Sequence, residues 1–141
     1  MTKIDECLNL VEDFDFDIFK FENIAKKDSL LYCAYNIFDV LNLFEDIIPE
    51  KAFNEFIKSI TNGYDRNIAY HNDIHALDVL QTTYVILEKG SFYYKLELSE
   101  LDYVSILLSA ICHDYKHPGF GNSYLINSFH NLAVNFNGNV Y

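Results

Sequence analysis

Apolar residues recur at three- and four-residue steps over most of this chain, which is the spacing that places side chains along one stripe of a helix. One stripe begins after Asp28, and a second follows Pro49, which suits a first helical turn, and ends at Gly63. No segment shows the two-residue alternation of a strand. The pattern therefore predicts an all-α fold in which these two helices are antiparallel and packed together. The first stripe consists of Leu30, Ala34, Ile37, Phe38, Leu41 and Phe44.

Three further helices are expected. One should cover about residues 72–88 and end near Gly90, and the last should cover about residues 123–135. Between them a helix should begin at Ser99, because Ser99 and Asp102 form a capping-box pattern. Its sequence, LDYVSILLSAIC, is apolar on nearly every side and too short to cross a bilayer, so we expect a buried central helix.

The charge balance restricts the class of partner. The 141 residues include 10 Lys and Arg against 21 Asp and Glu, which gives a formal net charge of -11. Such a chain is unsuited to long contacts with nucleic-acid backbone or anionic lipid. A small anionic substrate remains possible where bound cations supply the positive field.

The cysteines point to a reducing compartment. Cys7, Cys33 and Cys112 are odd in number and show no CxxC spacing, so neither a disulfide framework nor a thiolate zinc site is predicted. The first residues lack the apolar core of a signal peptide, and no apolar run reaches the ~20 residues of a membrane span. We therefore expect a cytoplasmic protein with no membrane span in this segment.

Four of the five histidines fall into two short clusters, YHNDIH and HDYKHPG. His71 and His75 are four residues apart, so on a helix they would project from one face. In the second cluster Asp114 directly follows His113 at the end of the apolar helix, whose negative dipole end favours a cation. His117 precedes a proline, so the helix should stop near this cluster.

A divalent metal explains both clusters at once. Burying a neutral imidazole and an ionised carboxylate costs several kcal/mol unless each finds a strong partner. Imidazoles with carboxylates suit zinc, iron, manganese or magnesium, and the mixed donor set hints at two different ions. The alternative, that each histidine is a satisfied core residue or a helix cap, fits a lone HxxxH better than it fits two clusters together.

Other polar residues carry weaker signals. Cys112 is unsuited to nucleophilic attack, because a thiol at the carboxyl end of an apolar helix should have a raised pKa. His130 lacks a second ligand at ligand spacing, so we expect a structural or surface role. Asp78 and Gln81 follow His75 on about the same face, where they could either orient metal ligands or pack on polar neighbours.

Two motifs resemble the catalytic domain of class I cyclic nucleotide phosphodiesterases, within the HD-domain phosphohydrolases. Residues 70–81, YHNDIHALDVLQ, are similar to the family pattern YHNxxHAxDVxQ, and residues 113–122, HDYKHPGFGN, are similar to HDxxHxxxxN. With FDIFKF near the start and NGY at 62–64, the resemblance covers roughly residues 13–137. It implies the N-terminal half of a multi-helix HD-type phosphodiesterase fold at 13–141, preceded by a lead-in at 1–12.

The resemblance also implies a set of metal ligands. His75, His113 and Asp114 would hold the tighter ion, usually zinc, and Asp114 would bridge to a second ion, usually magnesium or manganese. Two such ions would turn a site in an acidic protein into an anion-binding one.

The remaining implied roles concern the substrate. His71 would act as general acid, giving a proton to the departing 3'-oxygen while hydroxide supplied by the two ions attacks the phosphorus in line. The substrate would be a 3',5'-cyclic nucleotide and the product a 5'-nucleotide. Tyr70 would line the substrate pocket near His71, and His117 and Asn122 would lie just outside the metal ligands.

Departures from the family pattern shape the expected activity. Lys116 stands where the family usually has an acidic residue, and Asn131 replaces a common glutamate. The sequence ends at Tyr141, ahead of the family's ENHH segment, a later aspartate ligand and the residues that grip the purine. We therefore expect a truncated domain that is inactive alone.

The alternatives to this function are another HD-domain phosphohydrolase and a non-catalytic helical fragment that binds a partner. Cyclic AMP versus cyclic GMP preference, regulatory domains and oligomeric state are left open.

Overall fold

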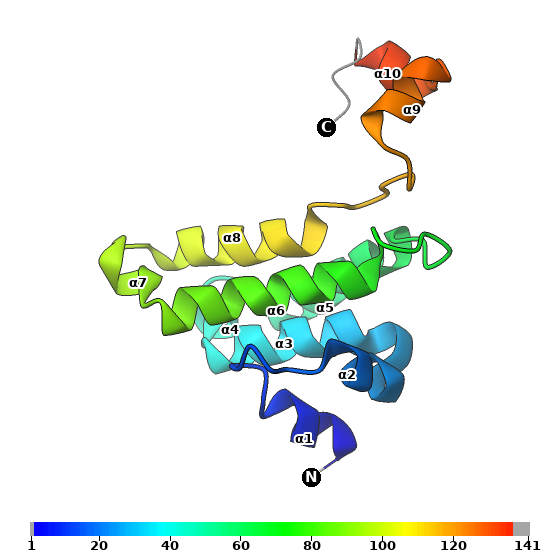
Figure 1. Ribbon diagram of the computed structural model, residues 1–141. Helices are drawn as coiled ribbons and strands as arrows, with labels where there is room; N and C mark the ends of the chain where they lie inside the picture. Colours follow the sequence, from blue (N-terminus) through cyan, green and yellow to red (C-terminus); the bar gives the residue numbers. More distant parts are fainter. Residues whose placement is uncertain (1, 137–141) are drawn as a thin grey trace.

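Helices account for all the regular structure in residues 2–136, the part of the chain that the computed structural model describes (Figure 1). The all-α prediction is therefore confirmed over this part. A short 3-10 turn at Lys26–Asp28 links the second and third helices. The α-helices are α1 (Lys3–Leu8), α2 (Ile18–Ala25), α3 (Ser29–Val40), α4 (Leu43–Asp46), α5 (Glu50–Gly63), α6 (Asp73–Lys89), α7 (Phe92–Lys95), α8 (Glu100–Cys112), α9 (Asn122–Asn127) and α10 (Asn131–Asn135).

The central helix is α6. It packs against α3 on one side and against α8 on the other, and α3 also packs against α5 (Figure 1). Because α6 is covered from two directions, its apolar residues lie on more than one face. They join the apolar stripe of α3 in one continuous core. The buried apolar residues of α6 are Ala76, Leu77, Leu80, Tyr84, Val85 and Leu87.

Our prediction that the helix LDYVSILLSAIC is central was wrong. Helix α8 lies at the edge of the bundle, with Leu101 exposed and the hydroxyls of Ser105 and Ser109 donating to backbone carbonyls of their own helix (Figure 1). Apolar composition alone does not set burial, because a face becomes buried only where another element covers it. The predicted start of α8 is confirmed, since Ser99 and Asp102 form a capping box.

Two predicted helices are each broken into two. The first breaks after Leu41, where Asn42 has a φ of 55°, and the last breaks at Phe129, with a φ of 52°. A left-handed residue ends a helix, and Asn adopts this conformation more readily than most residues. After the second break, His130 caps α10 by accepting a hydrogen bond at Nδ1 from the Leu132 N–H at 3.2 Å.

The other helix boundaries agree with the sequence. Helix α5 follows Pro49 and ends at Gly63, and α6 ends next to Gly90. The helices α1, α2 and α7 were not predicted. Within residues 2–136, no helix is both long enough and apolar enough to span a membrane.

The two ends of the described chain differ, because the N-terminal segment packs on the central bundle and the C-terminal helices do not. Near the start, the Gln81 side-chain amide donates to the carbonyls of Val11 and Asp13 at 2.8 Å each, and Val11 is buried. At the other end, α9 and α10 stand away from the bundle around a small apolar cluster of Leu125, Leu132 and Ala133 (Figure 1). The predicted boundary between residues 12 and 13 stays a prediction.

We predict that Leu80→Ala destabilises the fold by about 2–5 kcal/mol, because Leu80 is fully buried at the centre of the bundle. Urea unfolding followed by circular dichroism measures the change. Ile86→Ala on the same helix is the control, because Ile86 is 45% exposed and should cost far less. Equal losses in the two variants would contradict the central position of α6.

Candidate metal centre

The first turn of α6 fixes the position of His75. The Asn72 side-chain oxygen accepts hydrogen bonds from the N–H groups of Ile74 and His75 at 3.0 and 3.2 Å. The amide nitrogen of the same side chain donates to the Ile68 carbonyl at 2.9 Å. Asn72 therefore caps α6 and also fastens the preceding loop, which carries His71.

The end of α8 supplies His113 and Asp114. The His113 Nδ1 atom lies 2.9 Å from the Ala110 carbonyl oxygen. A carbonyl can only accept, so in this contact Nδ1 carries the hydrogen and Nε2 keeps its lone pair. That lone pair is the group with which a neutral imidazole binds a metal.

Three potential ligand atoms meet between the two helix ends. Asp114 Oδ2 lies 3.0 Å from His113 Nε2 and 3.5 Å from His75 Nε2, and the two nitrogens are 3.3 Å apart. Ligands of a tetrahedral zinc ion with bonds of about 2.0–2.1 Å are separated by about 3.3 Å. The three atoms therefore match one face of such a tetrahedron, and the donor set fits a divalent transition metal.

The local electrostatics favour the metal-binding form of His75. Burial lowers its pKa, and the neighbouring His113 lowers it further, although the carboxylates of Asp114 and Asp78 oppose the shift. A lowered pKa favours the neutral imidazole, which is the form that binds a metal. Protons therefore compete less with a metal ion for His75 than they do for an exposed histidine.

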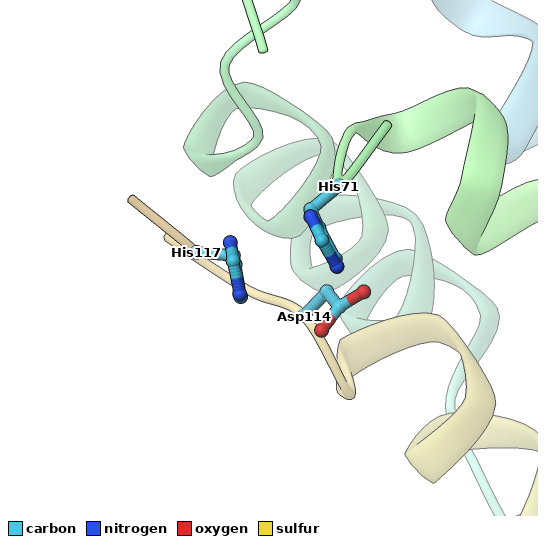
Figure 2. A group of neighbouring side chains, drawn as sticks. All are labelled: His71, Asp114 and His117. Atoms are coloured by element: carbon cyan, nitrogen blue, oxygen red, sulfur yellow. The ribbon is translucent and has the colours of Figure 1, made fainter. Parts of the chain in front are cut away.

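A second group of possible ligands shares Asp114. Potential ligand atoms of His71, Asp114 and His117 lie within 4.8 Å of one another, and Figure 2 shows the three side chains converging. The rings of His71 and His117 stack, with centroids 3.8 Å apart and planes inclined by 17°. Asp114 thus lies between two groups of imidazoles, as expected for a carboxylate that bridges two ions.

The hydrogen bonding of His117 suits a hydrogen-bond donor better than a metal ligand. Its Nδ1 accepts from the Gly119 N–H at 3.0 Å, so a neutral His117 carries its hydrogen on Nε2. Burial and the nearby His71 lower the pKa of His117, which favours this neutral form. The geometry is compatible with the expected place of His117 just outside the metal ligands.

Tyr70 lies beside the histidines. Its ring centroid is 4.4 Å from that of His75 and 5.0 Å from that of His71, and its side chain is largely exposed. Tyr70 and His75 also line a cavity of about 210 Å³, together with Asp78 and the apolar side chains of Ile18 and Phe19. This arrangement is compatible with the expected contact to a substrate.

The remaining candidates have different surroundings. Asn122 is the first residue of α9, and its expected place just outside the metal ligands stays a prediction. Lys116 is exposed, with its ammonium group 5.4 Å from the Tyr115 ring centroid. Gln81 binds the N-terminal segment instead of orienting a metal ligand. Cys112 is half-buried, and burial raises its pKa as expected for a thiol that is not a nucleophile.

Comparison with known proteins agrees with this geometry. Residues 70–140, half of the chain, match the family described as 3'5'-cyclic nucleotide phosphodiesterase. The chain belongs to this family. Over 92% of its length it is 37% identical to the 3',5'-cyclic-AMP phosphodiesterase 4 of Dictyostelium discoideum. Over 89% it is 34% identical to a mouse relative named high affinity cAMP-specific and IBMX-insensitive 3',5'-cyclic phosphodiesterase 8A. The chain spans only 12% and 15% of these two proteins.

Three contacts that support the candidate metal centre were not found by sequence reasoning. The Tyr64 hydroxyl donates to the Ile111 carbonyl of α8 at 2.8 Å, in a buried position. Arg66 binds Asp73 at the start of α6. At Gly63, an added Cβ would lie 2.0 Å from a ring carbon of Tyr115, next to Asp114. The NGY segment was noticed only for its resemblance, and no spacing rule connects it to these partners.

We predict that His75→Ala or His113→Ala weakens zinc binding by more than about 100-fold. Each change removes one of three converging ligands. Even the loss of a residue that only hydrogen-bonds to a metal ligand lowers metal affinity by about 10- to 100-fold. Competition with a chromophoric chelator measures the affinity. His130→Ala is the matched control, because His130 caps α10, and an equal loss in that variant would contradict the assigned site.

We predict that Gly63→Ala moves the Tyr115 ring, because an added Cβ would lie 2.0 Å from one of its carbons. Tyr115 is 38% exposed and its ring can turn away, so the free energy of unfolding should change by no more than about 1 kcal/mol. Zinc affinity should fall, because Tyr115 adjoins Asp114. Gly121→Ala is the control, since a Cβ there meets no atom within 4 Å. Unchanged zinc affinity in Gly63→Ala would contradict this prediction.

Proposed function

We propose that this chain forms the metal-binding part of a catalytic domain that hydrolyses 3',5'-cyclic nucleotides to 5'-nucleotides. The observation that carries the proposal is the convergence of His75, His113 and Asp114 from two family motifs onto one point. Membership of the phosphodiesterase family supports the reaction, and the names of several relatives support a cyclic nucleotide as substrate.

The proposed cofactors are two divalent ions. His75, His113 and Asp114 present two nitrogens and one oxygen, a set that suits zinc. On the side of His71 and His117, magnesium or manganese would be held by the Asp114 carboxylate and by water. When bound, such ions polarise phosphoryl oxygens and lower the pKa of water. In a chain with a net charge of -11, they also supply the positive field that an anionic substrate needs.

His71 is the proposed proton donor to the departing 3'-oxygen. It lies in the loop before α6 and groups with Asp114 and His117, outside the set of His75, His113 and Asp114. Stacking on His117 orients its ring, and the backbone N–H of Gly119 orients His117 in turn. An oriented imidazole is the group most often used for general acid catalysis. Tyr70, against the His75 ring, would contact the bound substrate.

A cytoplasmic location is part of the proposal. All three cysteines, Cys7, Cys33 and Cys112, are unpaired. Free thiols are typical of reducing compartments. Cyclic nucleotides would then reach the site from the same compartment.

A chimera tests the proposed activity. The segment of the Dictyostelium discoideum 3',5'-cyclic-AMP phosphodiesterase 4 that aligns with this chain is replaced by the chain itself, and cyclic AMP hydrolysis is measured. We expect turnover in the chimera and none in the 141-residue chain alone, which should still bind zinc. His71→Ala should lower kcat by about 10²–10⁴-fold, since it removes the proton donor.

Controls separate this proposal from its alternatives. His130→Ala in the chimera should retain parental turnover. A folded, metal-loaded chimera that hydrolyses ordinary nucleoside phosphates but no cyclic nucleotide would favour another HD-domain phosphohydrolase. Substantial hydrolysis of cyclic AMP by the short chain alone, abolished by His75→Ala, would contradict the expectation that further segments are needed.

A further inference from the structure

A partly buried ion pair lies at the start of α6, two residues before His75. Asp73, the first residue of α6, has a side chain only 1% exposed. Its two oxygens accept hydrogen bonds from Arg66, from Nε at 2.9 and 3.1 Å and from Nη2 at 2.6 Å. A buried carboxylate is costly unless it is paired and hydrogen-bonded. These hydrogen bonds therefore fix the position of Asp73 relative to Arg66.

The same guanidinium reaches a second helix. Arg66 Nη1 donates to Glu22 of α2 at 3.0 Å, and Nη2 donates to the Lys26 carbonyl at 3.3 Å. The five donors of an arginine lie in one rigid plane, so a single side chain can fix several acceptors relative to one another. Arg66 thus ties α2, the loop before α6 and the first turn of α6 together.

The loop that carries Arg66 also holds the other ligand-bearing helix. Tyr64, two residues before Arg66, donates its hydroxyl hydrogen to the Ile111 carbonyl of α8. Ile111 lies two residues before His113, and Asp73 lies two residues before His75. A three-residue stretch therefore grips both helix ends from which the metal ligands project.

We propose that Arg66 is a positioning residue of the metal centre. Through Asp73 it holds the start of α6 in the place that sets His75 Nε2 at 3.3 Å from His113 Nε2. This inference rests on the proposed metal-binding function and assigns Arg66 no contact with metal or substrate. Its role is to keep the distance between two ligands short enough for one ion.

The test uses two variants that separate positioning from stability. Arg66→Met removes the clamp and leaves a buried unpaired carboxylate, so it should lower both Tm and metal affinity. The double variant Arg66→Met/Asp73→Asn also removes the buried charge, so Tm should recover in large part. Metal affinity should not recover, because α6 is still not tied to the loop.

Two measurements on the 141-residue chain report the position of His75. The affinity for cobalt(II) is expected to fall about 10-fold or more in both variants. The visible absorption of the bound cobalt(II) should also lose the intensity typical of tetrahedral coordination. In the metal-free protein, a nuclear Overhauser effect between the ring protons of His75 and His113 is expected, since the ring centroids are 5.1 Å apart. That signal should weaken in both variants.

Lys89→Met is the matched control, because it breaks the ion pair with Asp13 at the far end of the same helix. It should change neither cobalt binding nor the His75–His113 signal. Recovery of parental cobalt affinity in the double variant, or an unchanged ring-proton signal in Arg66→Met, would overturn the proposal. Neither readout involves cyclic nucleotide, so an inactive chimera would contradict the proposed reaction without affecting this inference.

Discussion

The packing of α6 against α8 is the interaction on which the rest of the site depends. The two helices pack so that the start of α6 lies beside the end of α8 (Figure 1). Opposite ends of two helix dipoles are thereby brought together. The negative end of α8 suits a cation, and the positive end of α6 suits an anion. The end of α8 is therefore suited to a metal ion, and the start of α6 is suited to an anionic group.

Sequence patterns predicted the helices and the ligand clusters because both depend on short-range spacing. Asp114 directly follows His113, so local geometry places this pair, but His71 lies in the loop before α6, so the predicted shared helix face of His71 and His75 was wrong. The capping box at Ser99 is equally local. That the two clusters face each other depends on tertiary packing. The sequence suggested it because both clusters needed a partner and because their motifs resemble those of the phosphodiesterase family.

The errors arose where tertiary packing or a single backbone angle decides the outcome. The apolar sequence of α8 did not reveal that only one of its faces is covered. A left-handed φ at Phe129 divides the last helix, and bulky aromatic residues give little warning of this conformation. The ion pair of Arg66 with Asp73 was equally invisible, since a charged loop residue followed by an acidic helix start is common on solvated surfaces.

Asp114 belongs to both groups of possible ligands, and this sharing has a thermodynamic consequence. Two ions held by one carboxylate cannot be loaded independently. Any factor by which the first ion changes the affinity for the second must equal the factor by which the second changes the affinity for the first. In the proposed two-ion centre, the population of the doubly loaded form would therefore depend on both metal concentrations and on the sign of this coupling.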